Sequence, residues 1–417
     1  RALAADAAFA AGVDLGPLQG LPTSIKDLYG IQGLPTYAGS SMRLPEKWER
    51  EGPVVKAIKR QLATITGKTH TVEFAAGGIG DNCHWGAPRN PWDAERPRGP
   101  GGSSSGAGVS LWEGSAVVAF GSDTMGSVRI PASMTAVVGL KITMGRWSNE
   151  GIVPLRAVQD TPGPLARTVE DAGYVFAALD PAHAPDPAPF LELLAGTGMA
   201  GVTLGIADDC YWEGCAPGIE DTVRAGLSEL EAAGARLVDA PSPEAAELLE
   251  VVMSGGLPNS ELAGFLDHEL PTWVEQLDPA LAGRLEGSRN FLATEHLEKE
   301  KWLAGLAGSA PRNFDSVDVI VSPTLPITPP VLIDGRPESD PTNRPPVVGA
   351  RNTCPANFFR QCAISLPAGL DAQGMPVGLQ LTAPGGAEEK LLEIAVAAER
   401  VLGTNIQRLG TPPLLAA

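Results

Sequence analysis

The stretch RGPGGSSSGAGVS, Arg98 to Ser110, places three consecutive serines between glycines. Glycine allows backbone conformations that other residues rarely adopt, and a serine hydroxyl can act as a nucleophile or pass on a proton. The stretch leads directly into the apolar run VSLWEGSAVVAF, which argues against a flexible surface linker. We therefore expect a structured turn that positions hydroxyl groups for chemistry.

The bulk composition limits the classes of partner. The chain has 417 residues, 43% hydrophobic and 19% charged, with 31 Lys and Arg against 49 Asp and Glu, a net charge of −18. Such a field repels phosphate backbones and anionic membranes, so we expect neither nucleic acid nor a membrane as partner. Five scattered cysteines, an odd number, indicate no disulfide framework and favour a reducing compartment, the cytoplasm.

Short apolar runs punctuated by Gly and Pro organise the chain. SAVVAF (Ser115 to Phe120) and AVVGLKI (Ala136 to Ile142) predict buried strands of a mixed sheet. A proline-rich break at 180–190 precedes a strand and helix unit, helical patterns follow to residue 306, and strands return after residue 316. The pattern predicts an α/β fold.

Two familiar loops do not fit the serine run. GSSSG matches the G-x-S-x-G elbow of α/β-hydrolases with Ser104 at its centre, but the preceding NPWDAERPRGP is charged and broken by prolines. That elbow must follow a buried strand. A Walker loop is also disfavoured, because no Gly-Lys-Ser/Thr follows the glycines.

A serine nucleophile needs a base, and none of the five histidines adjoins a motif. His84 in DNCHWG is the one nearest to a candidate site, and a structural role suits it better. No histidine pair has metal-ligand spacing, so we expect no metal and no cofactor. Lys26 lies in the apolar run LPTSIKDLYG, where burial could lower its pKa enough for a neutral amine. A lone strand lysine is usually solvated, so this role depends on neighbouring motifs.

A second run of small residues, GSDTMGSVRIPAS from Gly121 to Ser133, follows the strand SAVVAF and supplies Ser127 at a tight turn. Successive backbone N–H groups at such a turn can point into one concavity. They would form an oxyanion hole without any side chain.

Six segments together resemble the amidase signature family. They are LPTSIKDLYG, GAPRNPWD, GGSSSGAG, GSDTMGSVRIPA, VVGLKIT and DTPGPLARTVEDA, in the family's order. Ser127 lies 24 residues after Ser103, and Lys26 lies 77 residues before it, which also agrees with the family. The close resemblance covers residues 17–180, and a weaker one returns at 316–384.

The resemblance implies one amidase-signature domain over residues 1–417, with a large mixed β-sheet flanked by α-helices on both faces. Its core would be formed by residues 17–180 and 316–417. The segment 190–310 would be a helical, variable part that contributes to the substrate pocket.

The resemblance also implies a Ser-cisSer-Lys triad. Ser127 would be the nucleophile, Ser103 the bridging serine after a cis peptide bond, and Lys26 the base. The reaction would cleave the C–N bond of a small or medium amide through an acyl-enzyme, with aryl carbamates and esters open to the same chemistry.

Further residues are assigned around this triad. The oxyanion hole would be formed by the backbone N–H groups of residues 124–127, with supporting roles for three nearby side chains and a substrate pocket formed in part by two short segments. These residues are Thr124, Met125, Gly126 and Ser127 for the hole, Ser104, Asp123 and Arg129 as support, and Gly77, Gly78, Ile79, Phe358 and Phe359 for the pocket. Met125 and Ser105 depart from the family, which usually has glycine at both positions.

Three functions therefore remain open. The first is a stand-alone amidase, a monomer or homodimer acting on a small molecule. The second is the ammonia-releasing component of a glutamine amidotransferase, its A subunit, which delivers ammonia to a partner protein. The third is a binding protein that kept the fold and lost its oxyanion geometry through Met125.

Overall fold

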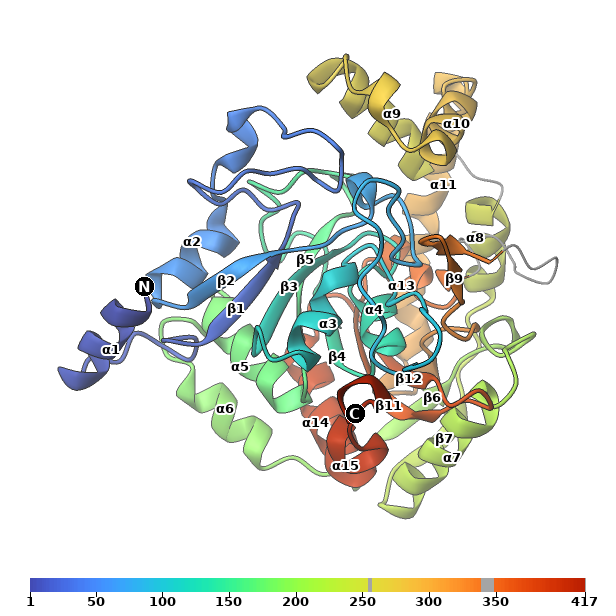
Figure 1. Ribbon diagram of the computed structural model, residues 1–417. Helices are drawn as coiled ribbons and strands as arrows, with labels where there is room; N and C mark the ends of the chain where they lie inside the picture. The colour runs from blue at the N-terminus through green and yellow to red at the C-terminus, as the bar shows by residue number, and fades with distance from the viewer. Residues whose placement is uncertain (254–256, 339–348, 417) are drawn as a thin grey trace.

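One mixed ten-stranded sheet dominates the computed structural model, which describes residues 1–253, 257–338 and 349–416 (Figure 1). The strand order is β2-β1-β3-β5-β4-β11-β12-β8-β6-β7. The strands are β1 (Pro22–Lys26), β2 (Thr64–Thr69), β3 (Val118–Asp123), β4 (Val138–Lys141), β5 (Thr161–Ala166), β6 (Thr203–Ile206), β7 (Arg236–Asp239), β8 (Val319–Pro323), β11 (Cys362–Leu370) and β12 (Pro376–Ala383).

The sheet is parallel at its two ends and antiparallel in its middle. β1 pairs in parallel with β2 and β3, and β6 pairs in parallel with β7 and β8. The strands from β3 through β5, β4, β11 and β12 to β8 are antiparallel neighbours. The predicted mixed sheet is confirmed. Its central strands are almost fully buried, as expected for strands covered on both faces.

Helices cover both faces of this sheet (Figure 1). α14 contacts α5 and α7, and all three contact the central strands. α3 and α4 contact each other; α3 also contacts β1, β2, β3 and β5, and α4 contacts β4, β11 and β12. The helices are α1 (Ala2–Ala10), α2 (Pro53–Arg60), α3 (Ser105–Trp112), α4 (Arg129–Met134), α5 (Val169–Leu179), α6 (Ala188–Ala195), α7 (Ile219–Ala232), α8 (Pro243–Met253), α9 (Leu257–Glu269), α10 (Pro279–Ser288), α11 (Ala293–Ser309), α13 (Cys354–Phe358), α14 (Glu388–Leu402) and α15 (Asn405–Leu409). Within the described ranges, no helix combines the length and apolar character that a membrane crossing requires.

The segment 190–310 is only partly helical, which corrects the helical assignment that the resemblance implied and agrees with the strand and helix unit expected after the break at 180–190. Residues 203–239 form β6, α7 and β7, and the two strands extend the sheet at one edge. α7 buries Val223, Leu227 and Leu230, whose spacing of four and three residues places them on one face of the helix. The following helices α8 to α11 gather beside the sheet, at the upper right of Figure 1. β9 (Leu332–Ile333) and β10 (Arg336–Pro337) form a separate hairpin, and residues 339–348 after it fall outside the described part.

The ends of two adjacent parallel strands position the candidate site. β1 ends at Lys26 and β3 ends at Asp123, and the carboxyl ends of parallel neighbours meet at the same edge of a sheet. The serine run reaches this edge immediately before α3, and the second small-residue run leaves it to begin α4.

Candidate active site

Lys26 is the last residue of β1, and its side chain is fully buried. Its Nζ donates to the Oγ atoms of Ser103 at 2.7 Å and Ser122 at 2.9 Å. Burial lowers the pKa of the Lys26 ammonium to about 7, against the opposing negative charges of Asp160 and Asp123. In a large fraction of the molecules, Lys26 is therefore a neutral amine near neutral pH, which is what a base requires.

Ser103 is fully buried and follows a cis peptide bond from Gly102, as the family resemblance implied. The Gly102 N–H donates to the carbonyl of Gly78 at 2.8 Å, and the Ser103 carbonyl accepts from Val72 at 3.1 Å. A Cβ on Gly102 would lie 2.9 Å from the backbone nitrogen of Gly80. Only glycine therefore fits before the bridging serine, which explains the glycines of the opening stretch.

Ser127 lies in the turn between β3 and α4 and is 7% exposed. Its carbonyl accepts from the backbone N–H of Ser104 at 3.4 Å, which ties the two serine runs together. Within the described residues its hydroxyl forms no hydrogen bond, whereas the hydroxyl of Ser103 is joined to Lys26. Catalytic hydrogen bonds in empty sites are often long and tighten when substrate binds. The geometry joins base and bridging serine and leaves the third hydroxyl available to a reacting group.

The turn before Ser127 corrects the expected set of oxyanion donors at Gly126. The Gly126 N–H donates to Asp123 Oδ1 at 2.8 Å, because this carboxylate lies inside the turn. The N–H groups of Thr124, Met125 and Ser127 donate no hydrogen bond in the described part of the chain. Three backbone donors rather than four are therefore available to an oxyanion.

Gly126 has no space for a side chain. Its φ is +126°, and a Cβ would lie 2.1 Å from Thr353 Oγ1, which itself donates to the Met125 carbonyl at 2.6 Å. The half-buried Met125 packs against a hydrophobic cluster that includes Ile79 and Ile130. The methionine at this position thus has its own packing environment, and the glycine that the turn requires is still present.

A buried ion pair supports the turn from below. Arg129 and Asp123 are both 0% exposed and lie 3.0 Å apart. Arg129 also donates to Asn357 Oδ1 at 2.6 Å and to Gln380 Oε1 at 2.7 Å. Burial alone would raise the pKa of the Asp123 carboxyl, but the charge and hydrogen bonds of Arg129 hold it at about 2. The Asp123 carboxylate therefore stays charged at neutral pH, and both side chains are saturated with hydrogen-bond partners. Their contacts brace the turn, and their supporting role in a reaction stays a prediction.

Ser104 and Ser105 hold the start of α3. The Ser104 Oγ lies 3.3 Å from the backbone nitrogen of Ser122 and 3.4 Å from its carbonyl. The Ser105 hydroxyl lies 2.7 Å from His70 Nδ1, and His70 Nε2 lies 3.0 Å from the Gly86 carbonyl. Burial lowers the pKa of His70 to about 4, so its neutral ring accepts from Ser105. This contact gives the departure at Ser105 a structural role.

Sequence reasoning missed several residues of the site. Ser122 is a second acceptor for Lys26, and Asp160 accepts from Thr124 Oγ1 at 2.5 Å. Burial raises the pKa of Asp160 to about 6, against the hydrogen bond from Thr124. Asp160 opens the motif DTPGPLARTVEDA and Ser122 lies within GSDTMGS, so both signals were present without an assigned role. Asn357 and Gln380 lie in the range 316–384, where the resemblance is weaker and no residue was assigned a supporting role.

The five predicted pocket residues separate in the structure. Gly77, Gly78 and Ile79 line a cavity of about 180 Å³ that is also lined by two arginines, Arg284 from α10 and Arg336 from β10. Phe358 and Phe359 are buried in the core instead. Phe359 borders a separate cavity of about 20 Å³, and Phe358 faces the Arg156 guanidinium at 5.5 Å. These two aromatic residues thus serve packing, because α13 turns them inward.

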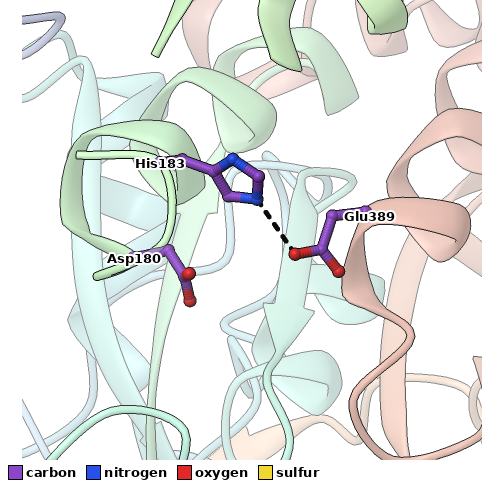
Figure 2. Close-up of side chains that lie close together, drawn as sticks. All are labelled: Asp180, His183 and Glu389. Carbon is purple, nitrogen blue, oxygen red and sulfur yellow. Dashed lines mark hydrogen bonds and ion pairs between the residues drawn. The ribbon is translucent and has the colours of Figure 1, made fainter. Parts of the chain in front are cut away.

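The histidines take structural positions. His84 Nε2 lies 2.9 Å from Glu73 Oε1, which agrees with the structural role favoured for it. His183 lies with Asp180 and Glu389 in a group whose potential ligand atoms all lie within 4.8 Å (Figure 2). Arg146 pairs with Asp180 at 2.6 Å and with Glu389 at 2.5 Å. A guanidinium thus supplies the positive charge that balances these carboxylates.

Comparisons with known proteins show which family this chain belongs to. The sequence profile of the Amidase family matches residues 1–392. The chain is 48% identical over 415 residues to 2-amino-5-chloromuconic acid deaminase of Comamonas testosteroni, covering 99% of this chain and 88% of that protein. It is 31% identical to the A subunit of the glutamyl-tRNA(Gln) amidotransferase of Salinispora arenicola, covering 99% and 89%.

A solved structure shows the same architecture. A crystal structure of an amidase matches with a TM-score of 0.80 and 28% identity, over 96% of this chain and 89% of that one. The profile match and the two relatives each extend over nearly the whole described sheet and its helices. The chain therefore belongs to the amidase family, the amidase-signature enzymes that act on C–N bonds.

Proposed function

We propose that this protein hydrolyses the C–N bond of a small amide through an acyl-enzyme on Ser127, with Ser103 as bridging serine and Lys26 as base. One observation carries the proposal. It is the fully buried Lys26, whose pKa is lowered to about 7 and whose Nζ donates to Ser103 Oγ at 2.7 Å. A buried lysine whose hydrogen-bond partners are two hydroxyls is suited to receive a proton rather than to hold one.

The proposed reaction uses the contact of Lys26 with Ser103 and requires the Ser127 hydroxyl to reach Ser103 when substrate binds. Neutral Lys26 takes the proton of Ser103, and Ser103 takes the proton of Ser127 as its Oγ attacks the substrate carbonyl. The backbone N–H groups of Thr124, Met125 and Ser127 stabilise the oxyanion. The same relay returns the proton to the leaving nitrogen, and water then cleaves the acyl-enzyme. Aryl carbamates and esters offer the same carbonyl and belong in the test.

A second candidate reaction is hydrolytic deamination of an amino-substituted unsaturated acid. The relative with 48% identity is a 2-amino-5-chloromuconic acid deaminase, and muconic acids carry two carboxylates. The cavity beside Gly77 and Gly78 is lined by Arg284 and Arg336, but also by Glu73, Asp81 and Asp278. Arg336 pairs with Asp278 at 2.8 Å, so Arg284 is the cation of this lining that suits a carboxylate of the substrate. In its imine tautomer such a substrate accepts an oxygen nucleophile at the carbon that bears nitrogen. Addition of water and loss of ammonia then give the keto acid.

The amidotransferase alternative predicts a different assembly. Relatives at 31% identity are A subunits of glutamyl-tRNA(Gln) amidotransferase. If this chain has the same role, it should release ammonia from glutamine and form a complex with a different partner protein. Light scattering on the purified protein measures its assembly. A monomer or homodimer that is active without a partner protein would contradict the amidotransferase role.

The cytoplasm also stays a prediction. It agrees with five cysteines that form no disulfide in the structure.

One panel tests these functions together. Purified protein is assayed for ammonia release from primary carboxamides, glutamine and a 2-aminomuconic acid, and for product release from aryl carbamates and aryl esters. We expect turnover of at least one C–N substrate and none by Ser127→Ala. A binding protein would show no turnover and no covalent adduct of Ser127 with an aryl sulfonyl fluoride in intact-mass spectra. Turnover by Ser127→Ala at the wild-type rate would contradict the nucleophile.

A further inference from the structure

The free N–H groups of the oxyanion turn lie on peptide units whose carbonyls are anchored. In a trans peptide the carbonyl and the following N–H point in opposite directions, so fixing one aims the other. The Asp123 carbonyl accepts from Thr161 Oγ1 at 2.9 Å, and this peptide carries the Thr124 N–H. The Thr124 carbonyl accepts from Gln159 Nε2 at 2.5 Å, and this peptide carries the Met125 N–H. Gln159 therefore sets the direction of one oxyanion donor.

Gln159 is itself held by Arg156. The Arg156 NH1 group donates to Gln159 Oε1, which leaves the Gln159 amide nitrogen directed at Thr124. The Arg156 backbone N–H donates to Asp160 Oδ2 at 3.1 Å, and the Thr124 hydroxyl donates to Asp160 Oδ1 at 2.5 Å. Both the carbonyl and the side chain of Thr124 are thus tied to the short segment 155–160. These four side chains are all buried in the structure.

The remaining nitrogens of Arg156 reach two helices beside the sheet. Its Nε donates to Glu261 of α9 at 2.7 Å, and its NH2 group donates to Glu300 of α11. The guanidinium side chain is only 3% exposed, whereas the two carboxylates are 26% and 34% exposed. One buried cation therefore joins two helices far along the chain to the residue that aims the Met125 N–H.

We propose that Arg156 and Gln159 are positioning residues that link α9 and α11 to the oxyanion turn and hold the Met125 N–H in its productive direction. This inference rests on the proposed function of Ser127, because an oxyanion forms only if that serine attacks. It assigns a role in the reaction to two residues that touch neither nucleophile nor base. A shift of α9 or α11 would reach the Met125 N–H through these two side chains.

The first test replaces Gln159 with leucine, which keeps the side-chain size and removes both hydrogen bonds. Complete loss of one oxyanion donor costs about 10²–10³ in kcat, so a misdirected donor is expected to cost about 10-fold to 100-fold. KM is expected to change by less than about 3-fold, because the ground-state contacts remain. The rate of Ser127 labelling by an aryl sulfonyl fluoride should fall with kcat, since a sulfonyl oxygen occupies the same hole.

The second test is a double-mutant cycle with Arg156→Met. We expect the double variant to have the kcat of the slower single variant, because both changes break one chain of contacts. Arg289→Met is the matched control, since Arg289 forms its ion pairs with Asp267 of α9 and Glu286 of α10, away from the turn. Its kcat should equal that of wild type. Effects of Gln159→Leu and Arg156→Met that multiply in the double variant would overturn the link between them.

Two further measurements separate the possible failures. If Ser127→Ala keeps activity, the proposed function fails; if Ser127→Ala is inactive and Gln159→Leu has wild-type kcat, only this inference fails. Circular dichroism confirms that each variant is folded. Should Arg156→Met not fold, the pair Glu261→Leu with Glu300→Leu removes both acceptors and releases Arg156 from the helices instead. A lower kcat in that pair supports the helix link, and an unchanged kcat overturns it.

Discussion

Replacing Lys26 with methionine tests whether this lysine is neutral in the folded protein. Methionine keeps the length of the side chain and cannot be charged. In the folded protein burial lowers the Lys26 pKa from 10.5 to about 7, whereas the unfolded chain keeps the ordinary value. Between these two values the unfolded state binds one more proton than the folded state. The stability of wild type therefore rises with pH in this window, and the variant lacks that rise.

The size of the effect follows from the pKa difference. One pH unit inside the window changes the free energy of unfolding by ~1.4 kcal/mol. From pH 7.5 to 9.5, wild type should therefore gain about 2–3 kcal/mol relative to Lys26→Met. Loss of the two hydrogen bonds to Ser103 and Ser122 adds a constant offset that does not depend on pH. The slope, not the offset, reports the charge of Lys26.

The assay is urea unfolding of both proteins at half-unit steps from pH 7.5 to 9.5, followed by circular dichroism. Lys141→Met is the matched control, because burial also lowers the pKa of Lys141, to about 8, while its Nζ donates to the Gln361 carbonyl at 2.7 Å. The stability difference between wild type and Lys141→Met should show a similar slope with pH. The kcat/KM of this variant should still fall on the acid side near pH 7, because Lys26, which causes that fall, is unchanged. If the difference in unfolding free energy between wild type and Lys26→Met does not change with pH, Lys26 is not a neutral amine in the folded protein and cannot be the base.

Three further predictions follow from the same contacts. Ser127→Ala should reduce ammonia release below detection with an unchanged melting temperature, and Ser103→Ala should reduce kcat by several orders of magnitude and also lower the melting temperature, because it removes an acceptor of buried Lys26; a rate near wild type in either would remove that serine from the relay. Gly126→Ala should be both inactive and destabilised by a few kcal/mol in urea unfolding, because its Cβ would lie 2.1 Å from Thr353 Oγ1. Burial raises the pKa of Glu399 to about 7, so its contribution to stability is complete below the ordinary value of 4.5 and is lost as pH rises through 7. Relative to wild type, Glu399→Gln should therefore gain about 2 kcal/mol between pH 5 and 7, and a constant difference in urea unfolding would contradict the raised pKa.

Much of the fold and the centre of the candidate site follow from local patterns in the sequence. Apolar runs bounded by Gly and Pro predict strands because burial on both faces needs continuous hydrophobic residues, and β3, β4 and β12 lie where such runs occur. The two small-residue runs and Lys26 identify the candidate relay because each belongs to a short motif with its own spacing. The structure places Ser103 within 2.7 Å of Lys26 across 77 residues of chain.

The tertiary structure alone decided which distant residues support that site. Gln159 and Arg156 reach the oxyanion turn because β5 pairs with β3, and no local pattern encodes that pairing. The same holds for Gly126, whose N–H was expected to be free and instead donates to Asp123. Local sequence sets backbone preference and burial over a few residues, whereas the partner of each polar group depends on the order of strands in the sheet and on which helices pack beside it.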